Sequence, residues 1–452
     1  MVGAKTKIER YESYKDSGIE WLGEIPAHWE IESFKHILTE RNEKNAPIKT
    51  KEILSLSIDK GVTLYAEKTT NLDRFKDDFS KYKLAHKGDL VFNSMNMIVG
   101  AVGVSDYFGC VSPVYYTYHG GLNNSYTTKF YEYLFRSKIV QGVLYSLGKG
   151  LMAIDRGDGK YNTLRLKVSR DDLRSMKLPF PNPSEQTQIV QFLNDKTTKI
   201  DEAIAIKQQQ IQLLKERKQI LIHKAVTQGL NPNVTLKNSG VEWIGEIPEH
   251  WEVTAVKYVL EIPITDGPHT TPELLDEGFP FISAEAIKKG EIDFNKKRGF
   301  ISEKDHKLFS LKYLPMRNDI YMVKSGATTG NIAMVKTDEE FSIWSPLAVF
   351  RSNLKRILPQ YLYIYLESSS FKKGVELSWS FGTQQNIGMG VLSNLPISFP
   401  SIEEQKEIST YIETTSQKIE TATNLKHQEI AKLKEYKSSL INSVVTGKVK
   451  VC

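Results

Sequence analysis

The chain has 452 residues, of which 40% are apolar and 25% charged, and its formal net charge is +6 at pH 7. This length predicts two or more domains, and no run of eighteen apolar residues is present that could span a bilayer. Only Cys110 and Cys452 are available, which excludes a disulfide framework and a cysteine-rich metal site. The first residues lack the apolar stretch of a secretory signal, so we expect a cytoplasmic protein.

A fourteen-residue phrase occurs twice along the chain. Residues 17–30 read SGIEWLGEIPAHWE and residues 239–252 read SGVEWIGEIPEHWE, with eleven identical positions. We call each copy the repeated phrase. Because the copies are 222 residues apart, the repeating unit has the size of a domain. The tryptophans of the phrase are expected to be packing anchors: Trp21, Trp29, Trp243 and Trp251.

The region after each phrase contains short strand-like runs and little helix. Residues 89–95 (DLVFNSM) and 319–325 (DIYMVKS) predict strands, while residues 129–138 and 360–369 predict short helices. Residues 87–104 align with residues 317–334, and this alignment places Gly100 on Gly330. The pattern indicates two equivalent α+β globules whose loops differ.

Each globule is followed by a long predicted helix. The helices begin near residues 182 and 401, with Asn182 and Ser401 as N-caps, and end at glycines that suit left-handed C-caps. Glu185 and Glu404 occupy the third helical position in the two copies. Apolar residues follow a heptad in both helices, which favours a coiled coil within the chain, although each helix packing only on its own globule is an alternative.

The charges along the heptad favour antiparallel helices. A parallel pair would align Lys218 with Lys437, so that like charges face each other. An antiparallel pair with its axis near the helix midpoints brings Lys218 close to Glu413 and Lys437 close to Asp195, although Lys207 and Lys426 would still meet near the centre. We therefore expect a two-fold relation between the halves.

No motif for catalysis is found. The histidines form no metal-binding pair, and no phosphate-binding loop or dinucleotide-binding turn is present. Glu-x-Lys triplets of nuclease type begin at Glu216, Glu404 and Glu435, but all lie on the long helices, where such pairs are typical of solvated faces. The sequence therefore predicts a chain that is not an enzyme and binds no cofactor or metal.

The order of these features resembles the specificity subunit of type I restriction-modification enzymes over nearly the whole chain. The matching features are the Trp-x-Gly-x-Ile-Pro-x-x-Trp phrase, the Phe-Pro entry into each helix, and the stretch ITDGPHTTPELLDEGFPFI at residues 264–282. The first globule has no clear counterpart of the Asp-Gly-x-His part of that stretch.

The resemblance implies an α+β fold with two pseudo-two-fold-related target-recognition domains separated by two long antiparallel coiled-coil helices. The first recognition domain is expected at residues 1–180 and the second at residues 230–400, each with its repeated phrase. The spacer helices are expected at residues 181–229 and 401–452. Such a protein reads a split double-stranded DNA site, with one half for each recognition domain.

The resemblance also implies partners. The helices are expected to dock two methyltransferase subunits, and restriction or translocase subunits join through the complex. Catalysis, S-adenosylmethionine, ATP and magnesium would then belong to those partners rather than to this chain.

Candidate DNA-binding residues lie in polar loops, where amide, hydroxyl and cationic side chains can reach bases and phosphates. In each case an ordinary turn or surface loop is the alternative. The candidates of the first globule are Asn93, Ser94, Asn96, Lys149, Arg156, Lys160 and Arg165. Those of the second globule are His269, Thr270, Lys324, Ser325, Thr328, Thr329, Asn331, Gln384, Gln385 and Asn386.

Two other classes of function stay open from the residues alone. The chain could be a coiled-coil scaffold without DNA specificity, or the specificity module of another DNA-modification or phage-defence system. A self-contained methyltransferase-nuclease would need the catalytic motifs that are missing.

Overall fold

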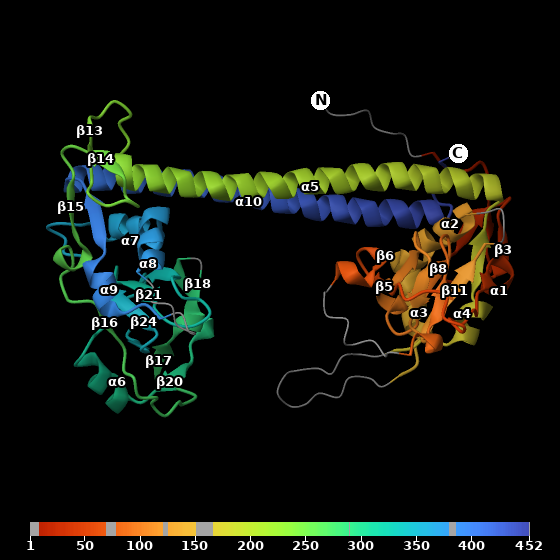
Figure 1. The fold of residues 1–452 in the computed structure, drawn as a ribbon, viewed down its shortest axis with the longest axis horizontal. Helices are drawn as coiled ribbons and strands as arrows, with labels where there is room; N and C mark the ends of the chain where they lie inside the picture. Colours follow the sequence, from red (N-terminus) through yellow and green to blue (C-terminus); the bar gives the residue numbers. More distant parts are fainter. Residues whose placement is uncertain are drawn as a thin grey trace. The chain divides into compact units, whose positions relative to one another are not determined.

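The computed structural model describes residues 9–68, 78–120, 125–150, 166–288, 290–378 and 386–451. The chain divides into two compact units (Figure 1): unit 1 comprises residues 1–207 and 428–452, and unit 2 comprises residues 208–427. Each unit therefore contains a globule and one part of each long helix. In the described residues, no helix combines the length and apolar character that crossing a membrane requires.

The two globules are built on the same four-stranded antiparallel sheet. In unit 1 the strand order is β4 (Thr39–Glu40), β11 (Tyr115–His119), β8 (Leu90–Asn93) and β9 (Val102–Val104). In unit 2 the order is β16 (Thr265–Asp266), β24 (Leu347–Phe350), β21 (Ile320–Val323) and β22 (Ile332–Met334). Gly100 and Gly330 both adopt left-handed backbone, with φ of 90° and 89°. The predicted alignment of these segments is confirmed.

A pair of helices follows the sheet in each unit. Unit 1 has α2 (Ser125–Arg136) and α3 (Lys138–Leu147), and unit 2 has α7 (Pro359–Glu367) and α8 (Ser369–Leu377). A serine between the paired helices caps the second one: Ser137 accepts from the Val140 amide, and Ser368 accepts from the Phe371 amide. The buried faces of these helices pack with residues of the sheet in an apolar cluster of each unit.

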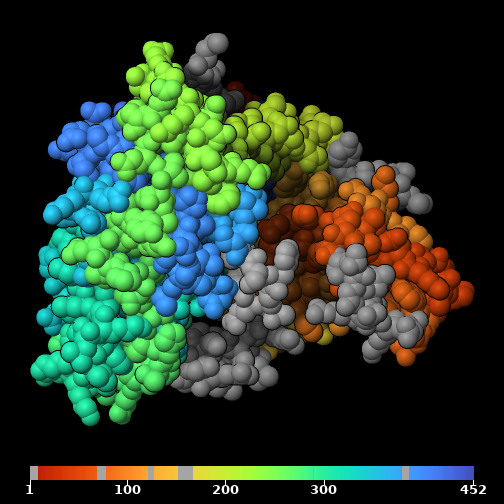
Figure 2. Space-filling model, turned by 60° about the vertical axis from the view of Figure 1, so that its left-hand side comes forward, coloured from red at the N-terminus to blue at the C-terminus, as the bar shows by residue number. Residues whose placement is uncertain are grey.

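Each globule is closed by its first and last strands, which lie next to a short helix. β3 (Glu30–Ser33) pairs with β12 (Lys177–Phe180), and β15 (Glu252–Ala255) pairs with β25 (Pro396–Phe399). Figure 2 shows green surface, the colour of the residues around β15, beside blue surface, the colour of the residues around β25. The short helices are α1 (Phe34–Ile37) and α4 (Arg170–Ser175) in unit 1, and α9 (Met389–Asn394) in unit 2.

The remaining strands differ between the units. Unit 1 adds the pairs β5 (Leu54–Ser57) with β6 (Gly61–Leu64), and β7 (Lys83–Ala85) with β10 (Gly109–Val111). Unit 2 adds β17 (Phe279–Ile282) between β20 (Gly299–Ile301) and the parallel β23 (Ser342–Ile343), the pair β18 (Ile287–Lys288) and β19 (Glu291–Ile292), and helix α6 (Glu303–Ser310). The frame is thus shared and the insertions are particular to each unit.

Each repeated phrase forms a hairpin that joins the ends of the two long helices, α5 (Pro183–Gln228) and α10 (Ile402–Val445). The hairpins are β1 (Tyr14–Asp16) with β2 (Glu24–Pro26), and β13 (Leu236–Asn238) with β14 (Glu246–Pro248). In unit 1 the indole of Trp29 donates to Glu185 at 2.9 Å, and His28 lies 2.9 Å from the same carboxylate. Trp29 also packs on Gly447, where an added Cβ would lie 3.1 Å from the ring.

Unit 2 repeats this contact with the helices exchanged. The indole of Trp251 donates to Glu404 at 3.2 Å, and His250 lies 2.8 Å from that carboxylate. Gly229, at the end of α5, packs against Trp251. We call each set of contacts the tryptophan clamp. In each unit the clamp fixes the start of one long helix beside the end of the other, as antiparallel helices require.

The predicted antiparallel direction is confirmed by ion pairs within unit 1. Lys207 contacts Glu429 at 2.5 Å, and Lys437 contacts Asp201 at 2.7 Å. A higher residue number on α5 is therefore paired with a lower residue number on α10, as in antiparallel helices. The predicted contact of Lys437 with Asp195 is wrong. Asp195 instead pairs with Lys199, four residues along the same helix. Asp195 and Asp201 are six residues apart on α5, which is about 9 Å or nearly two helical turns, so the midpoint argument places the register of the two helices wrongly by that amount.

The ion pairs of unit 1 can be tested by chemical cross-linking. Carbodiimide treatment of the full chain should join Asp201 to Lys437 and Lys207 to Glu429, because each carboxylate already contacts its ammonium. Peptide mass spectrometry would identify both cross-links, and Lys437→Arg should remove the first while keeping the second. Recovery of an Asp195–Lys437 cross-link as the major product would contradict the observed pairing.

The tryptophan clamp predicts a pH-dependent contribution to stability. Burial opposes ionisation of Glu185, but hydrogen bonds from Tyr11, Trp29 and His28 outweigh it and hold the pKa of this carboxyl below its ordinary value of 4.5. A lowered folded pKa means that the contribution is present at neutral pH and is lost as the pH falls through the folded pKa. We expect Glu185→Gln to lower the free energy of unfolding by about 1–3 kcal/mol at pH 7.

Denaturant unfolding at several pH values measures this effect. The difference between wild type and Glu185→Gln should shrink as the pH falls below 4.5. Glu404→Gln is the matched comparison in unit 2, and its effect should be smaller because Glu404 is 26% exposed whereas Glu185 is 6% exposed. An equal difference at pH 7 and at pH 3 would contradict the assignment to the ionised clamp.

Candidate nucleic-acid interface

The candidate interface in each unit is the hairpin between the two last strands of the shared sheet. In unit 2, residues 324–331 connect β21 to β22, and Gly326 and Gly330 take positive φ values of 103° and 89°. The Gly330 amide donates to the Val323 carbonyl, and the Thr329 hydroxyl donates to the Gly326 carbonyl, so the turn is internally bonded. These bonds leave Thr328 and Asn331 as exposed polar side chains.

Unit 1 has the equivalent hairpin at residues 94–101, between β8 and β9. The side chain of Asn93 accepts from the Met95 amide at 3.1 Å, which holds the turn at its first residue. Ser94 is buried, and its carbonyl accepts from the Val168 amide. Met95 and Asn96 are the exposed residues at the tip.

The structure brings a second predicted loop to the base of each hairpin. In unit 2 the Ile387 amide donates to the Lys324 carbonyl at 2.8 Å, and Ser325 forms a β-bridge with Asn386. In unit 1 Val168 makes the corresponding bond, and Lys149 forms a bridge with Lys167. In each unit, the ends of two loops that are far apart along the chain therefore meet at one place.

The other predicted residues have varied surroundings. Lys149 is 80% exposed and lies 3.3 Å from Asp172, while His269 is 70% exposed and lies 3.2 Å from Asp266. Thr270 is exposed beside it. The ammonium of Lys324 contacts Asp266 at 2.9 Å and is largely buried. Five predicted residues lie outside the described residues: Arg156, Lys160, Arg165, Gln384 and Gln385.

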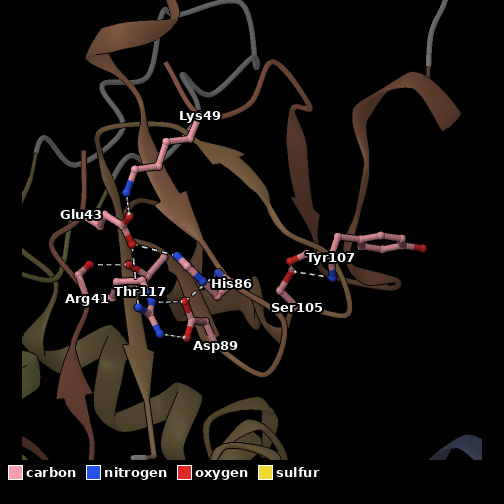
Figure 3. A network of polar contacts seen from close by, with 8 residues as sticks. All are labelled: Arg41, Glu43, Lys49, His86, Asp89, Ser105, Tyr107 and Thr117. Atoms are coloured by element: carbon pink, nitrogen blue, oxygen red, sulfur yellow. Dashed lines mark hydrogen bonds and ion pairs between the residues drawn. The ribbon is translucent and has the colours of Figure 1, made fainter. Parts of the chain in front are cut away.

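A buried aspartate lies just before the first strand of each hairpin, at the end of the strand away from the turn. No sequence motif pointed to it. In unit 1, Asp89 accepts two hydrogen bonds from Arg41, at 2.6 and 3.1 Å, and one from the His86 amide (Figure 3). Figure 3 also shows Glu43 between His86 and Lys49, and the Thr117 hydroxyl donating to the Arg41 carbonyl at 2.6 Å. The network ties β4, β8 and β11 together.

Unit 2 places an equivalent pair at the same point by another route. Asp319 precedes β21, as Asp89 precedes β8, and accepts from Arg351 at 2.8 and 2.7 Å. Arg351 follows β24, whereas Arg41 follows the edge strand β4. Each unit thus binds its aspartate with an arginine, but the arginine follows a different strand of the sheet in each unit. Charge-assisted bidentate pairs of this kind fix the sheet from which the hairpin extends.

Two kinds of reactive group that can support catalysis are metal-binding clusters and cysteine thiols. The described residues contain no group of three or more His, Cys, Asp or Glu side chains placed to bind a metal ion. Cys110 is buried, and this burial raises the pKa of its thiol to about 11, which disfavours the nucleophilic thiolate.

Comparison with known proteins identifies relatives over nearly the whole chain. A family model described as "Type I restriction modification DNA specificity domain" matches residues 248–433. A Methanocaldococcus jannaschii chain, provisionally named as the specificity subunit of type I restriction enzyme MjaX, is 27% identical over 95% of this chain and 96% of its own length. The MjaVIII specificity subunit of the same organism is 27% identical over 63% of this chain and 64% of its own length.

A solved structure shares the fold. A chain from a study of complex assembly and conformational transition of the type I R-M system matches with a TM-score of 0.67. The match covers 93% of this chain and 98% of that chain at 14% sequence identity, so this likeness concerns the fold alone.

Proposed function

We propose that this chain, which belongs to the family of type I restriction-modification specificity subunits, selects DNA sites by reading one half-site with each of its two units. One observation carries the proposal: the same frame presents a hairpin and a second loop at the same place in both units. Shared frames with different loop residues are suited to reading two different sequences.

The exposed side chains of the hairpins have the chemistry of base recognition. Asn96 in unit 1 and Asn331 in unit 2 can both donate and accept hydrogen bonds, as recognition of an adenine edge requires. Thr328 adds a hydroxyl that can bind a base or a phosphate. Because the exposed residues differ between the hairpins, we expect an asymmetric bipartite site.

The long helices are the proposed docking surface for the methyltransferase subunits. On α5, Leu213 and Ile220 lie seven residues apart and are 55% and 56% exposed. Apolar residues at heptad spacing that remain exposed on a helix are suited to pack against a partner helix. Restriction or translocase subunits would join through the same complex, and the reacting cofactors would be bound by the partners.

A scaffold without DNA specificity is the second candidate. The exposed apolar residues on α5 agree with it equally well, but it gives no role to the hairpins and their second loops. The specificity module of a different DNA-modification or defence system would use the same interface with other partners.

Separate readout by the hairpins can be tested with single substitutions. Asn331→Ala should weaken binding by about 1–3 kcal/mol at one base pair of one half-site, and Asn96→Ala should do the same in the other half-site. Competition binding to duplexes with single base-pair changes would measure both effects. Gln209→Ala, an exposed amide on α5, is the control. Unchanged site preference in both asparagine variants would remove the hairpins from the reading surface.

The proposal that this chain is not catalytic gives a second test. With S-adenosylmethionine and DNA, the purified chain alone should transfer no methyl groups, whereas the chain assembled with its methyltransferase subunits should modify specific sites. Filter binding of labelled methyl groups measures both. Turnover by the isolated chain, or equal modification by methyltransferase subunits without it, would contradict the proposed role.

A further inference from the structure

A buried carboxylate in unit 2 is surrounded by more positive charge than it can neutralise. Asp266 is fully buried at the end of β16, and its oxygens contact the ammonium of Lys312 at 2.5 Å and that of Lys324 at 2.9 Å. His269 lies 3.2 Å away as a third partner. Burial opposes ionisation of Asp266, but the hydrogen bonds from both lysines outweigh it and lower the pKa of its carboxyl. One ionised carboxylate and two ammonium groups leave one positive charge.

Other buried aspartates in the same protein provide a comparison. Arg41 is bound to Asp89, and Arg351 to Asp319, and these arginines are 24% and 17% exposed. Each of these guanidinium groups faces its buried carboxylate inside the sheet. By contrast, Lys312 is 48% exposed and His269 is 70% exposed, so the surplus charge around Asp266 faces solvent.

The backbone around Asp266 creates space for a ligand beside these groups. A Cβ at Gly267 would lie 2.0 Å from the Ile343 carbonyl oxygen, so only glycine allows the chain to pass here. A cavity of about 190 Å³ lies beside Lys312 and is lined by Asp266, Gly267 and Tyr313 together with the apolar Leu308 and Phe309, while His269 lies outside its lining. Several water molecules, each of roughly 30 Å³, would fill this volume.

The same cluster is connected to the reading hairpin. Lys324 is the first residue of the hairpin, and its amide donates to Pro346 while its carbonyl accepts from Ile387. A ligand held at Lys312 is therefore joined to the base of the hairpin through two contacts, Lys312 to Asp266 and Asp266 to Lys324.

We propose that Lys312 and His269, oriented by Asp266, bind one backbone phosphate of the DNA and so fix the register of hairpin 324–331 on the duplex. This inference rests on the proposed function and adds the phosphate-binding residues of unit 2. Lys312 and His269 are the groups that touch the phosphate, while Asp266 and Lys324 position them. Lys312 belongs to no recognisable motif, because it lies in an ordinary stretch after α6.

The salt dependence of binding tests this role. Lys312→Met, in the full chain assembled with its methyltransferase subunits, is compared with wild type on a duplex that the wild-type complex selects from a random pool. Losing one phosphate contact should reduce the slope of log K against log salt by about 0.9. A loss of affinity of about tenfold at 50 mM salt would then shrink to about threefold at 200 mM. Lys307→Met is the matched control, because Lys307 lies on α6, five residues before Lys312, and pairs one-to-one with Glu303.

A second measurement separates a phosphate contact from a structural effect. Single methylphosphonate groups, which remove one backbone charge, are scanned along the duplex. For wild type, one position in the half-site read by unit 2 should weaken binding, and the same position should have no further effect with Lys312→Met. His269→Ala, which changes an exposed side chain, should reduce the effect at that position even if Lys312→Met does not fold.

The outcomes distinguish the inference from the function on which it rests. If the wild-type complex selects no sequence from the pool, the proposed function fails. If it selects a sequence but Lys312→Met binds with the wild-type salt slope, or if no methylphosphonate position couples to Lys312 or His269, the phosphate assignment alone is overturned.

Discussion

The tryptophan clamp is the contact on which the architecture of each unit depends. A glutamate at the start of one long helix accepts from the indole of the repeated phrase, and the same ring packs on the glycine that ends the other helix. A larger residue at Gly447 would meet Pro26 at 2.3 Å, and its φ of 71° already favours glycine. One short phrase therefore sets where both helices begin and end, and it does so twice.

The clamp also explains why the rest of each globule can vary. β3 with β12, and β15 with β25, close each globule directly beside the clamp, so the intervening residues attach to a fixed frame. The shared sheet is then secured by a buried aspartate and arginine, which the two units obtain from different strands. Both units keep the aspartate–arginine pair although the arginine follows a different strand in each. The same sheet can therefore carry hairpins of different sequence.

Much of the frame could be predicted from the sequence because it is repeated or periodic. The copies of the phrase, the heptads and the capping residues Asn182 and Ser401 depend on neighbours close in the chain, and the Glu185 amide does donate to Asn182. The partner of Lys437 could not be predicted, because the register of the two helices is set by their packing, and this register brings Asp201 rather than Asp195 to Lys437. The contact of Lys324 with Asp266 could not be predicted either, because Asp266 lies 58 residues before Lys324 in the chain.

The central claim is that two equivalent units each read one half-site, and exchanging a globule tests it most directly. In a chimera, residues 34–176 are replaced by residues 256–395, so that both frames carry the globule of unit 2 between the paired closing strands. The DNA sites methylated by the assembled complex are then mapped by sequencing. The account predicts that the site becomes an inverted repeat of the half-site read by unit 2. An unchanged asymmetric site in a folded, active complex would contradict it.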